Sequence, residues 1–107
     1  MSVTIRDLST YNSINSISFG EKVVFFKFGG EWCSPCVELD KVLTTVSDSM
    51  LYKISVDNDD FNSFLMDNKI YNIPVTIIKY KEHTTRFQGV RTLEQILEMV
   101  EKLKQGQ

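Results

Sequence analysis

The chain has 107 residues, 42% of them hydrophobic, and a net charge of −2 at neutral pH. This length and apolar content suit one domain with one core, so we expect residues 1–107 to form a single domain with a frayed polar tail at 104–107. The charge excludes the basic surface that nucleic-acid binding needs, and the longest apolar run, residues 23–26, is far too short to span a membrane.

The start of the chain and its cysteine content favour a cytoplasmic location. Residues 1–7 lack the basic start and the apolar stretch of a secretory signal. In a reducing compartment, the only two cysteines of the chain are not expected to form a permanent structural disulfide. Their chemistry is therefore of more interest than their packing.

The first half of the chain predicts alternating strands and helices. Residues 3–6 alternate as a short strand, and residues 8–17 carry apolar side chains three apart, as in a weak helix. Residues 22–28 are almost continuously apolar, which is typical of a strand buried on both faces of a parallel sheet. Residues 34–47 carry one apolar helical face, and residues 51–56 alternate as a third strand.

The second half predicts a short helix followed by a hairpin. Asp59 or Asp60 is placed to cap a helix that buries apolar side chains within residues 61–65. Residues 75–80 are rich in β-branched side chains, and residues 84–88 can pair with them across a turn.

The last helix completes an α/β pattern. Thr92 and Gln95 have the spacing of a capping box at its start. The element order is then β-α-β-α-β-α-β-β-α, which indicates a mixed central sheet with helices on both faces. The predicted apolar face of this helix consists of Leu93, Ile96, Leu97, Val100 and Leu103.

The residues with the clearest chemistry are Cys33 and Cys36, where the most apolar strand gives way to a helix. Side chains three apart on a helical turn are neighbours, so the two sulfurs can join reversibly. Cys33 lies at the helix start, where free N–H groups and the helix dipole lower the pKa of its thiol and make it the nucleophile. Cys36 lies one turn inside, where burial keeps it a thiol until it resolves a mixed disulfide. Pro35 falls in the first turn, where its missing N–H costs little.

Two other interpretations of the cysteine pair remain at this point. The thiols could be inert core residues, or they could hold a metal or an iron–sulfur cluster shared between two chains. Zinc needs four ligands, and within one chain only His83, in the predicted hairpin turn, could join the two cysteines. We therefore expect no metal site within the chain.

The segment Trp32-Cys33-Ser34-Pro35-Cys36 resembles the active-site motif of the thioredoxin family, with Ser34 where that family most often has glycine. The resemblance extends over nearly the whole chain and implies the thioredoxin fold. It implies that Ile73–Pro74 is a cis-proline loop facing the cysteines, although an ordinary trans turn is the alternative. It further implies that Lys53 lies beneath the active site.

The resemblance also implies a substrate groove formed by Trp32, Ile73, Pro74 and Gly89. In the family, the backbone of the residue before the proline pairs with the substrate chain, and a glycine before the last helix lets that chain approach closely. Trp32 could instead be a core residue, and Gly89 could simply end a strand.

Three positions depart from the family pattern. Lys27 stands where the family has a buried aspartate that helps to move the proton of the second cysteine, Gly29 replaces an often aromatic residue, and Lys41 replaces a kinking proline. Lys27 and Lys53 would bring two ammonium groups close together beneath Cys36, so we expect one to be neutral or turned outward. A cation near the sulfurs favours thiolate and makes the protein more oxidising. Alternatively, Lys27 extends to the strand edge and reaches water.

The expected function is reduction of protein disulfides through the Cys33/Cys36 dithiol. The resemblance implies an NADPH-dependent thioredoxin reductase as electron donor, disulfide-containing proteins as substrates, and no bound cofactor beyond the redox-active disulfide. We expect a monomer that binds neither nucleic acid nor membrane. The alternatives are a thioredoxin-fold binding module and a metal-bridged dimer, both with little redox turnover.

Overall fold

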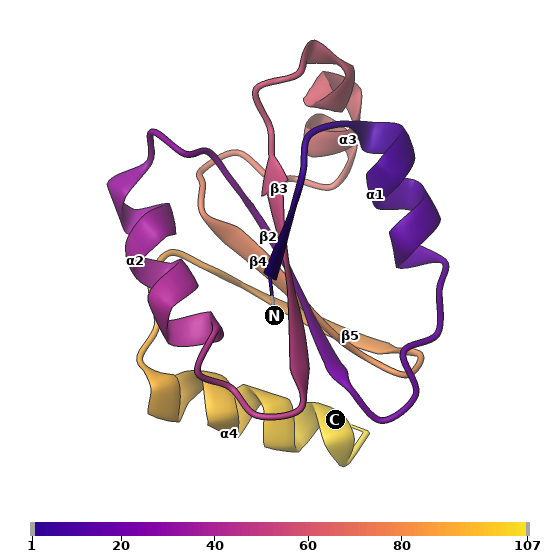
Figure 1. Ribbon diagram of the computed structural model, residues 1–107, viewed down its shortest axis with the longest axis vertical. Coiled ribbons are helices and arrows are strands. Elements are labelled where there is room, and N and C mark those ends of the chain that lie inside the picture. The colour runs from indigo at the N-terminus through magenta and orange to yellow at the C-terminus, as the bar shows by residue number, and fades with distance from the viewer. Residues whose placement is uncertain (1, 107) are drawn as a thin grey trace.

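The computed structural model describes residues 2–106, which form a five-stranded sheet with helices on both faces (Figure 1). This architecture and the predicted element order are confirmed, with one added 3₁₀ turn, η1. The elements in chain order are β1 (Ser2–Ile5), α1 (Leu8–Asn15), β2 (Val23–Gly29), α2 (Ser34–Leu43), β3 (Ser49–Ser55), η1 (Asp59–Phe61), α3 (Asn62–Asp67), β4 (Val75–Tyr80), β5 (His83–Gln88) and α4 (Leu93–Lys104).

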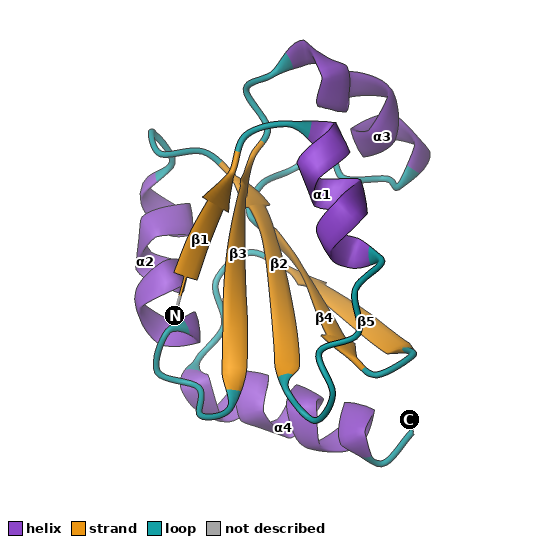
Figure 2. Ribbon diagram, turned by 45° about the vertical axis from the view of Figure 1, so that its right-hand side comes forward, coloured by secondary structure: helices purple, strands orange, loops and turns teal. Residues whose placement is uncertain are grey.

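The sheet is mixed, as the sequence predicts. Its strand order is β1-β3-β2-β4-β5, with β2 in the middle (Figure 2). β1, β3 and β2 run parallel, whereas β4 runs antiparallel to β2 and β5 antiparallel to β4. Among residues 2–106, none of the helices combines the length and the apolarity that crossing a bilayer requires.

β2 divides the core into two layers because its side chains alternate between the faces of the sheet. Val23 and Phe25 pack with α2 and α4 on one face, and Val24, Phe26 and Phe28 pack with α1 and the η1–α3 segment on the other. The figures show the same division of the helices (Figure 1). The same period of two places position 27 and position 29 on the α2 face, directly under the helix that begins with the cysteines.

α2 ends at Leu43, four residues before the predicted end. The hydroxyls of Thr44 and Thr45 donate to the carbonyl oxygens of Lys41 and Val42. Threonine hydroxyls that bond to nearby carbonyls in this way compete with continued helix. The spacing of apolar residues, on which the prediction rested, does not reflect this competition.

Two other helix ends differ from prediction. Asn58, and neither Asp59 nor Asp60, caps the η1 turn by accepting the N–H of Asp60, while α3 has no side-chain cap. The predicted frayed tail at 104–107 is wrong at Lys104, which is the last residue of α4. Residue 107 lies outside the described residues.

The predicted capping box of α4 is confirmed, but its apolar face is narrower than predicted. The Thr92 hydroxyl accepts the N–H of Gln95, and the Gln95 side chain accepts the N–H of Thr92. Ile96 is fully buried, whereas the neighbouring Leu97 is 44% exposed. Leu93 is also exposed, so the helix packs through Ile96, Val100 and Leu103.

This difference along α4 gives a stability prediction. Ile96→Ala should lower the free energy of unfolding by about 2–5 kcal/mol, because it leaves a cavity between α4 and the sheet. Leu97→Ala, the matched control one residue away, should change it by no more than about 0.5 kcal/mol. Equilibrium unfolding in denaturant measures both values, and equal losses would show that the helix is docked in another rotation.

Candidate active site

The loops that carry the predicted site residues meet at one end of the sheet. β2 ends at Gly29, which pairs with Ser55 at the end of β3. On its other side, Phe28 pairs with Val75 at the start of β4, and Val75 pairs with Gln88 at the end of β5. The loops that follow β2, β3 and β5 and the loop that precedes β4 are therefore neighbours. The strand register thus brings site residues that are far apart in the sequence to the same end of the sheet.

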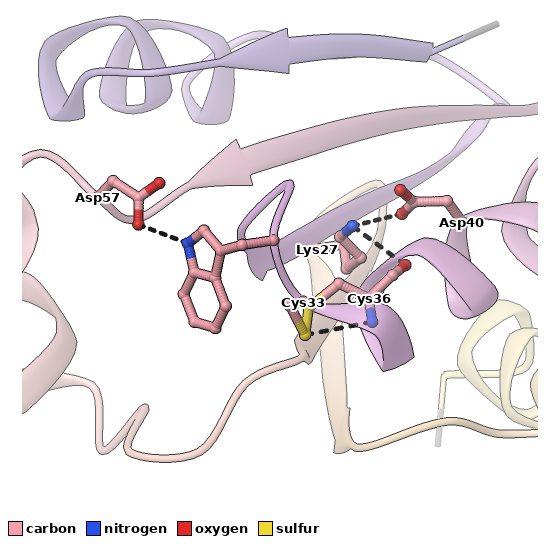
Figure 3. Close-up of a disulfide and its surroundings, with 6 residues drawn as sticks. Lys27, Cys33, Cys36, Asp40 and Asp57 are labelled. Atoms are coloured by element: carbon pink, nitrogen blue, oxygen red, sulfur yellow. Dashed lines mark hydrogen bonds and ion pairs between the residues drawn. A yellow bond between two sulfur atoms is a disulfide. The ribbon is translucent and has the colours of Figure 1, made fainter.

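Cys33 and Cys36 are joined in a disulfide at the start of α2, with their Cα atoms 5.2 Å apart (Figure 3). Cys33 is the N-cap residue of this helix, and its Sγ accepts the backbone N–H of Cys36 at 3.3 Å. Cys33 is 7% exposed and Cys36 is fully buried. Only the first sulfur thus combines access to the surface with a backbone donor and the positive end of the helix dipole.

The chain forms a helix start at this point for local reasons. Cys33 has an extended backbone (φ −91°, ψ 107°), which is the usual conformation of an N-cap residue. Ser34 and Pro35 make up the beginning of the first turn, where proline sacrifices no hydrogen bond. The motif residues therefore build the helix terminus that serves the first sulfur.

Trp32 is a surface residue, not a core residue. It is 67% exposed, and its indole Nε1 donates to Asp57 at 2.9 Å (Figure 3). Gly30 lies directly under the ring, since a Cβ at that position would be 2.5 Å from Nε1. Asp57, which was not singled out from the sequence, therefore fixes the indole beside Cys33.

The predicted cis bond between Ile73 and Pro74 is present. The N–H of Gly89 donates to the carbonyl of Pro74 at 2.8 Å, which holds the two predicted groove loops together. Gly89 has φ +78°, a conformation that favours glycine. Tyr71, two residues before Ile73, is 70% exposed and was not singled out from the sequence. Nothing in its local pattern distinguishes it from other loop tyrosines.

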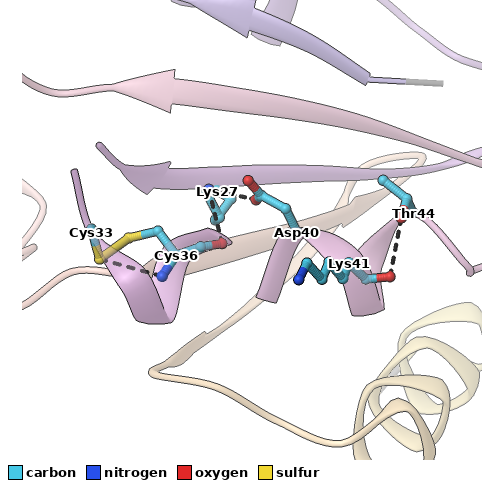
Figure 4. A network of polar contacts seen from close by, with 6 residues as sticks. All are labelled: Lys27, Cys33, Cys36, Asp40, Lys41 and Thr44. Carbon is cyan, nitrogen blue, oxygen red and sulfur yellow. Dashed lines mark hydrogen bonds and ion pairs between the residues drawn. A yellow bond between two sulfur atoms is a disulfide. The ribbon is translucent and has the colours of Figure 1, made fainter. Parts of the chain in front are cut away.

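Lys27 does not reach water at the strand edge. It is only 3% exposed, and its Nζ lies 2.5 Å from Asp40 Oδ1 and donates to the Cys36 carbonyl at 3.3 Å (Figure 4). Lys53, which pairs with Lys27 across β2 and β3, is partly exposed. The expected crowding of two cations is thus relieved by a carboxylate on α2 that sequence analysis missed.

The charges of this layer explain why Asp40 is needed. Burial lowers the pKa of Lys27, while the hydrogen bond and the charge of Asp40 raise it and the charge of Lys53 lowers it further. A buried ammonium without a partner costs several kcal/mol in lost hydration. The signal for the pair was present in the sequence: a lysine within an apolar strand and an aspartate four residues after Cys36, on the same side of the helix.

A cavity of about 200 Å³ opens beside this ion pair. Lys27, Gly29, Asp40 and Lys53 are among the residues that line it. Gly29 also touches the second cysteine, since a Cβ at this position would lie 2.6 Å from Cys36 Sγ. The cavity therefore reaches from the surface to the wall against which the buried sulfur packs. Among residues 2–106, no three potential metal ligands (His, Cys, Asp or Glu) cluster together.

The lowered pKa of Lys27 predicts a pH dependence of stability. A lysine whose pKa is lower in the folded state binds fewer protons there, so folding gains stability as the pH rises from the folded pKa toward the ordinary value of 10.5. Replacing Lys27 with Met should remove this gain. Burial raises the pKa of Tyr11 and of Tyr52, but both proteins share these effects, so they cancel in the comparison.

Unfolding in denaturant at a series of alkaline pH values tests this effect. The free energy of unfolding of the unaltered protein minus that of Lys27→Met should increase with pH and level off near 10.5. A difference that is constant across the series would mean that Lys27 has the same pKa folded and unfolded.

Among curated proteins, the chain is 31% identical over 85 residues to thioredoxin Y1, chloroplastic, of Arabidopsis thaliana. That match covers 76% of this chain and 49% of the relative. It is 28% identical over 88 residues to thioredoxin O, mitochondrial, of Oryza sativa subsp. japonica, covering 78% of this chain and 51% of the relative. The chain thus spans about half the length of these curated relatives.

Solved structures show the same fold. Chloroplastic thioredoxin z superposes with a TM-score of 0.73 at 23% identity, over 97% of this chain and 96% of that chain. Thioredoxin O2 from Arabidopsis thaliana, in its oxidised state, superposes with a TM-score of 0.73 at 18% identity, over 95% of this chain and 93% of that chain. The family model named Thioredoxin matches residues 4–102, which include every element except the first residues of β1 and the last of α4. The chain belongs to the thioredoxin family.

Proposed function

We propose that this chain is a thiol–disulfide oxidoreductase that reduces protein disulfides. The observation that carries the proposal is the difference between the two sulfurs: Cys33 Sγ accepts a backbone N–H at the helix start, and Cys36 is buried one turn inside. Family membership and the disulfide between the two residues support the same function.

Cys33 is the nucleophile of the proposed reaction. Its thiolate, stabilised by the Cys36 N–H and the helix dipole, attacks one sulfur of a substrate disulfide. A bond forms between Cys33 Sγ and that sulfur, the substrate S–S bond breaks, and the second substrate sulfur leaves as a thiolate that takes a proton from solvent.

Cys36 is the resolving residue. Its sulfur attacks Cys33 Sγ, the mixed disulfide breaks, and the substrate leaves with its second thiol. Two electrons have then moved from the dithiol to the substrate, and the chain holds the Cys33–Cys36 disulfide that the structure describes.

Substrate binds, in this proposal, in a groove made by Trp32, Ile73, Pro74 and Gly89. The indole is exposed beside Cys33, and the Gly89–Pro74 hydrogen bond aligns the two loops. Tyr71, which is exposed on the loop that leads to Ile73, is a further residue that substrate could contact. Ser34 and Pro35 shape the helix start, and Lys27 and Lys53 lie in the polar layer beneath it.

The proposal also covers the cellular setting. The oxidised dithiol is reduced again by an NADPH-dependent thioredoxin reductase, and the chain acts as a monomer without a bound cofactor. A reducing compartment such as the cytoplasm suits this cycle, because a dithiol that donates electrons must be kept reduced there.

The roles of the two cysteines predict different variant behaviour. Cys36→Ser should accumulate a covalent complex with a disulfide-bonded reporter protein, because Cys33 can still attack and nothing resolves the product. Cys33→Ser, the matched control, should form no such complex. Non-reducing electrophoresis and mass spectrometry detect the covalent complex. Normal turnover by Cys36→Ser would show that Cys36 is not the resolving residue.

Catalytic turnover distinguishes the oxidoreductase from a binding module. With NADPH, a thioredoxin reductase and a disulfide-bonded reporter protein, the chain should drive continuous NADPH oxidation, and Cys33→Ser should give only the background rate. A module that binds its partner without turnover, or a metal-bridged dimer found in protein purified without oxygen, would overturn the proposal.

A further inference from the structure

The resolving step requires a proton acceptor that the two cysteines do not supply. Cys36 is fully buried, and burial in apolar surroundings favours the neutral thiol over the thiolate that must attack Cys33. Its proton therefore has to leave at neutral pH into a layer that is mostly closed to water. The groups around the cavity beside Gly29 are the ones to consider.

Four charged side chains face this cavity: Lys27 from β2, Lys53 from β3, Glu31 from the loop before the motif, and Asp40 from α2. The two lysines, as ammonium ions, have no lone pair with which to accept a proton. Glu31 has a side chain that is 70% exposed and pairs with Arg6 at the surface. Asp40, with a side chain that is 20% exposed, is the carboxylate left at the buried end.

The position of Asp40 suits proton transfer from Cys36. Residues four apart on a helix have neighbouring side chains, with Cβ atoms about 5–6 Å apart. Lys27 lies between the two, with its Nζ in contact with Asp40 Oδ1 and bonded to the Cys36 carbonyl (Figure 4). Cys36 Sγ itself packs on Gly29, which lines the same cavity as Asp40.

The carboxylate also has capacity to accept a proton. Asp40 Oδ1 is paired with Lys27 Nζ, and this ion pair occupies only one of the roughly four acceptor positions of an ionised carboxylate. Thr76, which pairs with Lys27 across β2 and β4, has a buried hydroxyl oxygen that lacks a hydrogen-bond partner within residues 2–106. Buried polar atoms are rarely left without partners, and this hydroxyl lies in the same layer as the ion pair.

We propose that Asp40 accepts the Cys36 thiol proton during resolution, with Lys27 as the positioning residue that holds the carboxylate and faces the developing thiolate. The proton moves from Cys36 Sγ to the Asp40 carboxylate through the cavity as Sγ attacks Cys33 Sγ. The bond between Cys33 and the substrate breaks, and the departing substrate thiolate takes up a proton from solvent. Asp40 returns its proton to solvent through the open side of the cavity. This inference rests on the proposed roles of Cys33 and Cys36.

A two-step reaction with a nitrobenzoate disulfide reagent tests the inference and separates it from those roles. Attack by Cys33 releases one coloured thiolate, and resolution by Cys36 releases a second, so stopped-flow absorbance follows each step separately. Asp40→Asn should leave the first step unchanged and slow the second by roughly tenfold or more at pH 7. The deficit should shrink at alkaline pH, where hydroxide can take the Cys36 proton without help from a carboxylate.

Further variants separate proton transfer from simple disturbance of the fold. Asp40→Glu should recover much of the second step, and Glu38→Gln, which alters an exposed carboxylate on the same helix, should match the unaltered protein. The double variant Lys27→Met/Asp40→Asn removes both members of the buried ion pair, so neither charge is left buried without its partner and folding is protected. It should show the same pH-dependent deficit.

The outcomes are distinct. The role of Asp40 would be overturned if Asp40→Asn, or the double variant, carried out the second step as fast as the unaltered protein does. It would also be overturned if either variant slowed this step by one constant factor at every pH. Loss of the first step in the unaltered protein would instead overturn the proposed function. A faster second step in Asp40→Asn would show that the carboxylate only offsets the charge of Lys27, which also contradicts proton transfer.

Discussion

The hydrogen bond from the Cys36 N–H to Cys33 Sγ is the interaction on which the proposed chemistry depends. It exists because Cys33 has an extended backbone at the N-cap position and α2 starts directly after it. The same geometry puts Cys36 one turn inside, against Gly29 and out of contact with solvent. One helix start thus makes two identical side chains chemically different, since N–H groups and the helix dipole favour an anion only at its mouth.

The sheet supplies the second constraint, because the alternation of β2 decides what lies beneath that helix. Every other side chain of this strand faces α2, so an apolar layer of Val23 and Phe25 gives way to Lys27 just below the cysteines. A buried ammonium requires a negative partner nearby, and α2 provides it one turn after Cys36. The thioredoxin family usually has its buried acid on the strand, as the resemblance implied. In this chain the strand carries the buried lysine, Lys27, and the helix carries the carboxylate, Asp40.

Much of this could be predicted from the sequence, where local rules and the fold agree. The order of strands and helices, the capping box at Thr92 and the cysteine pair at a helix start all follow from short-range patterns. Helix ends were predicted less well, because the hydroxyls of Thr44 and Thr45 compete with the backbone in a way that apolar periodicity does not express.

The Lys27–Asp40 pair was missed for another reason. It joins residues on different elements, and although Lys27 stands out within an apolar strand, Asp40 alone looks like an ordinary charged residue of a helix. The bond between Trp32 and Asp57 likewise depends on strand register that the sequence does not display.

The central claim is that the two thiols of the reduced protein ionise separately because of their places on α2. The most direct measurement is a pH titration of the two thiols in the reduced protein. Ultraviolet absorbance follows thiolate formation, and the carbon-13 shifts of labelled cysteine assign it to each residue. The account predicts that Cys33 becomes a thiolate at a distinctly lower pH than a free cysteine does, and that Cys36 remains a thiol until the solution is well above that pH. Two thiols that titrate together, like unperturbed cysteines, would contradict it.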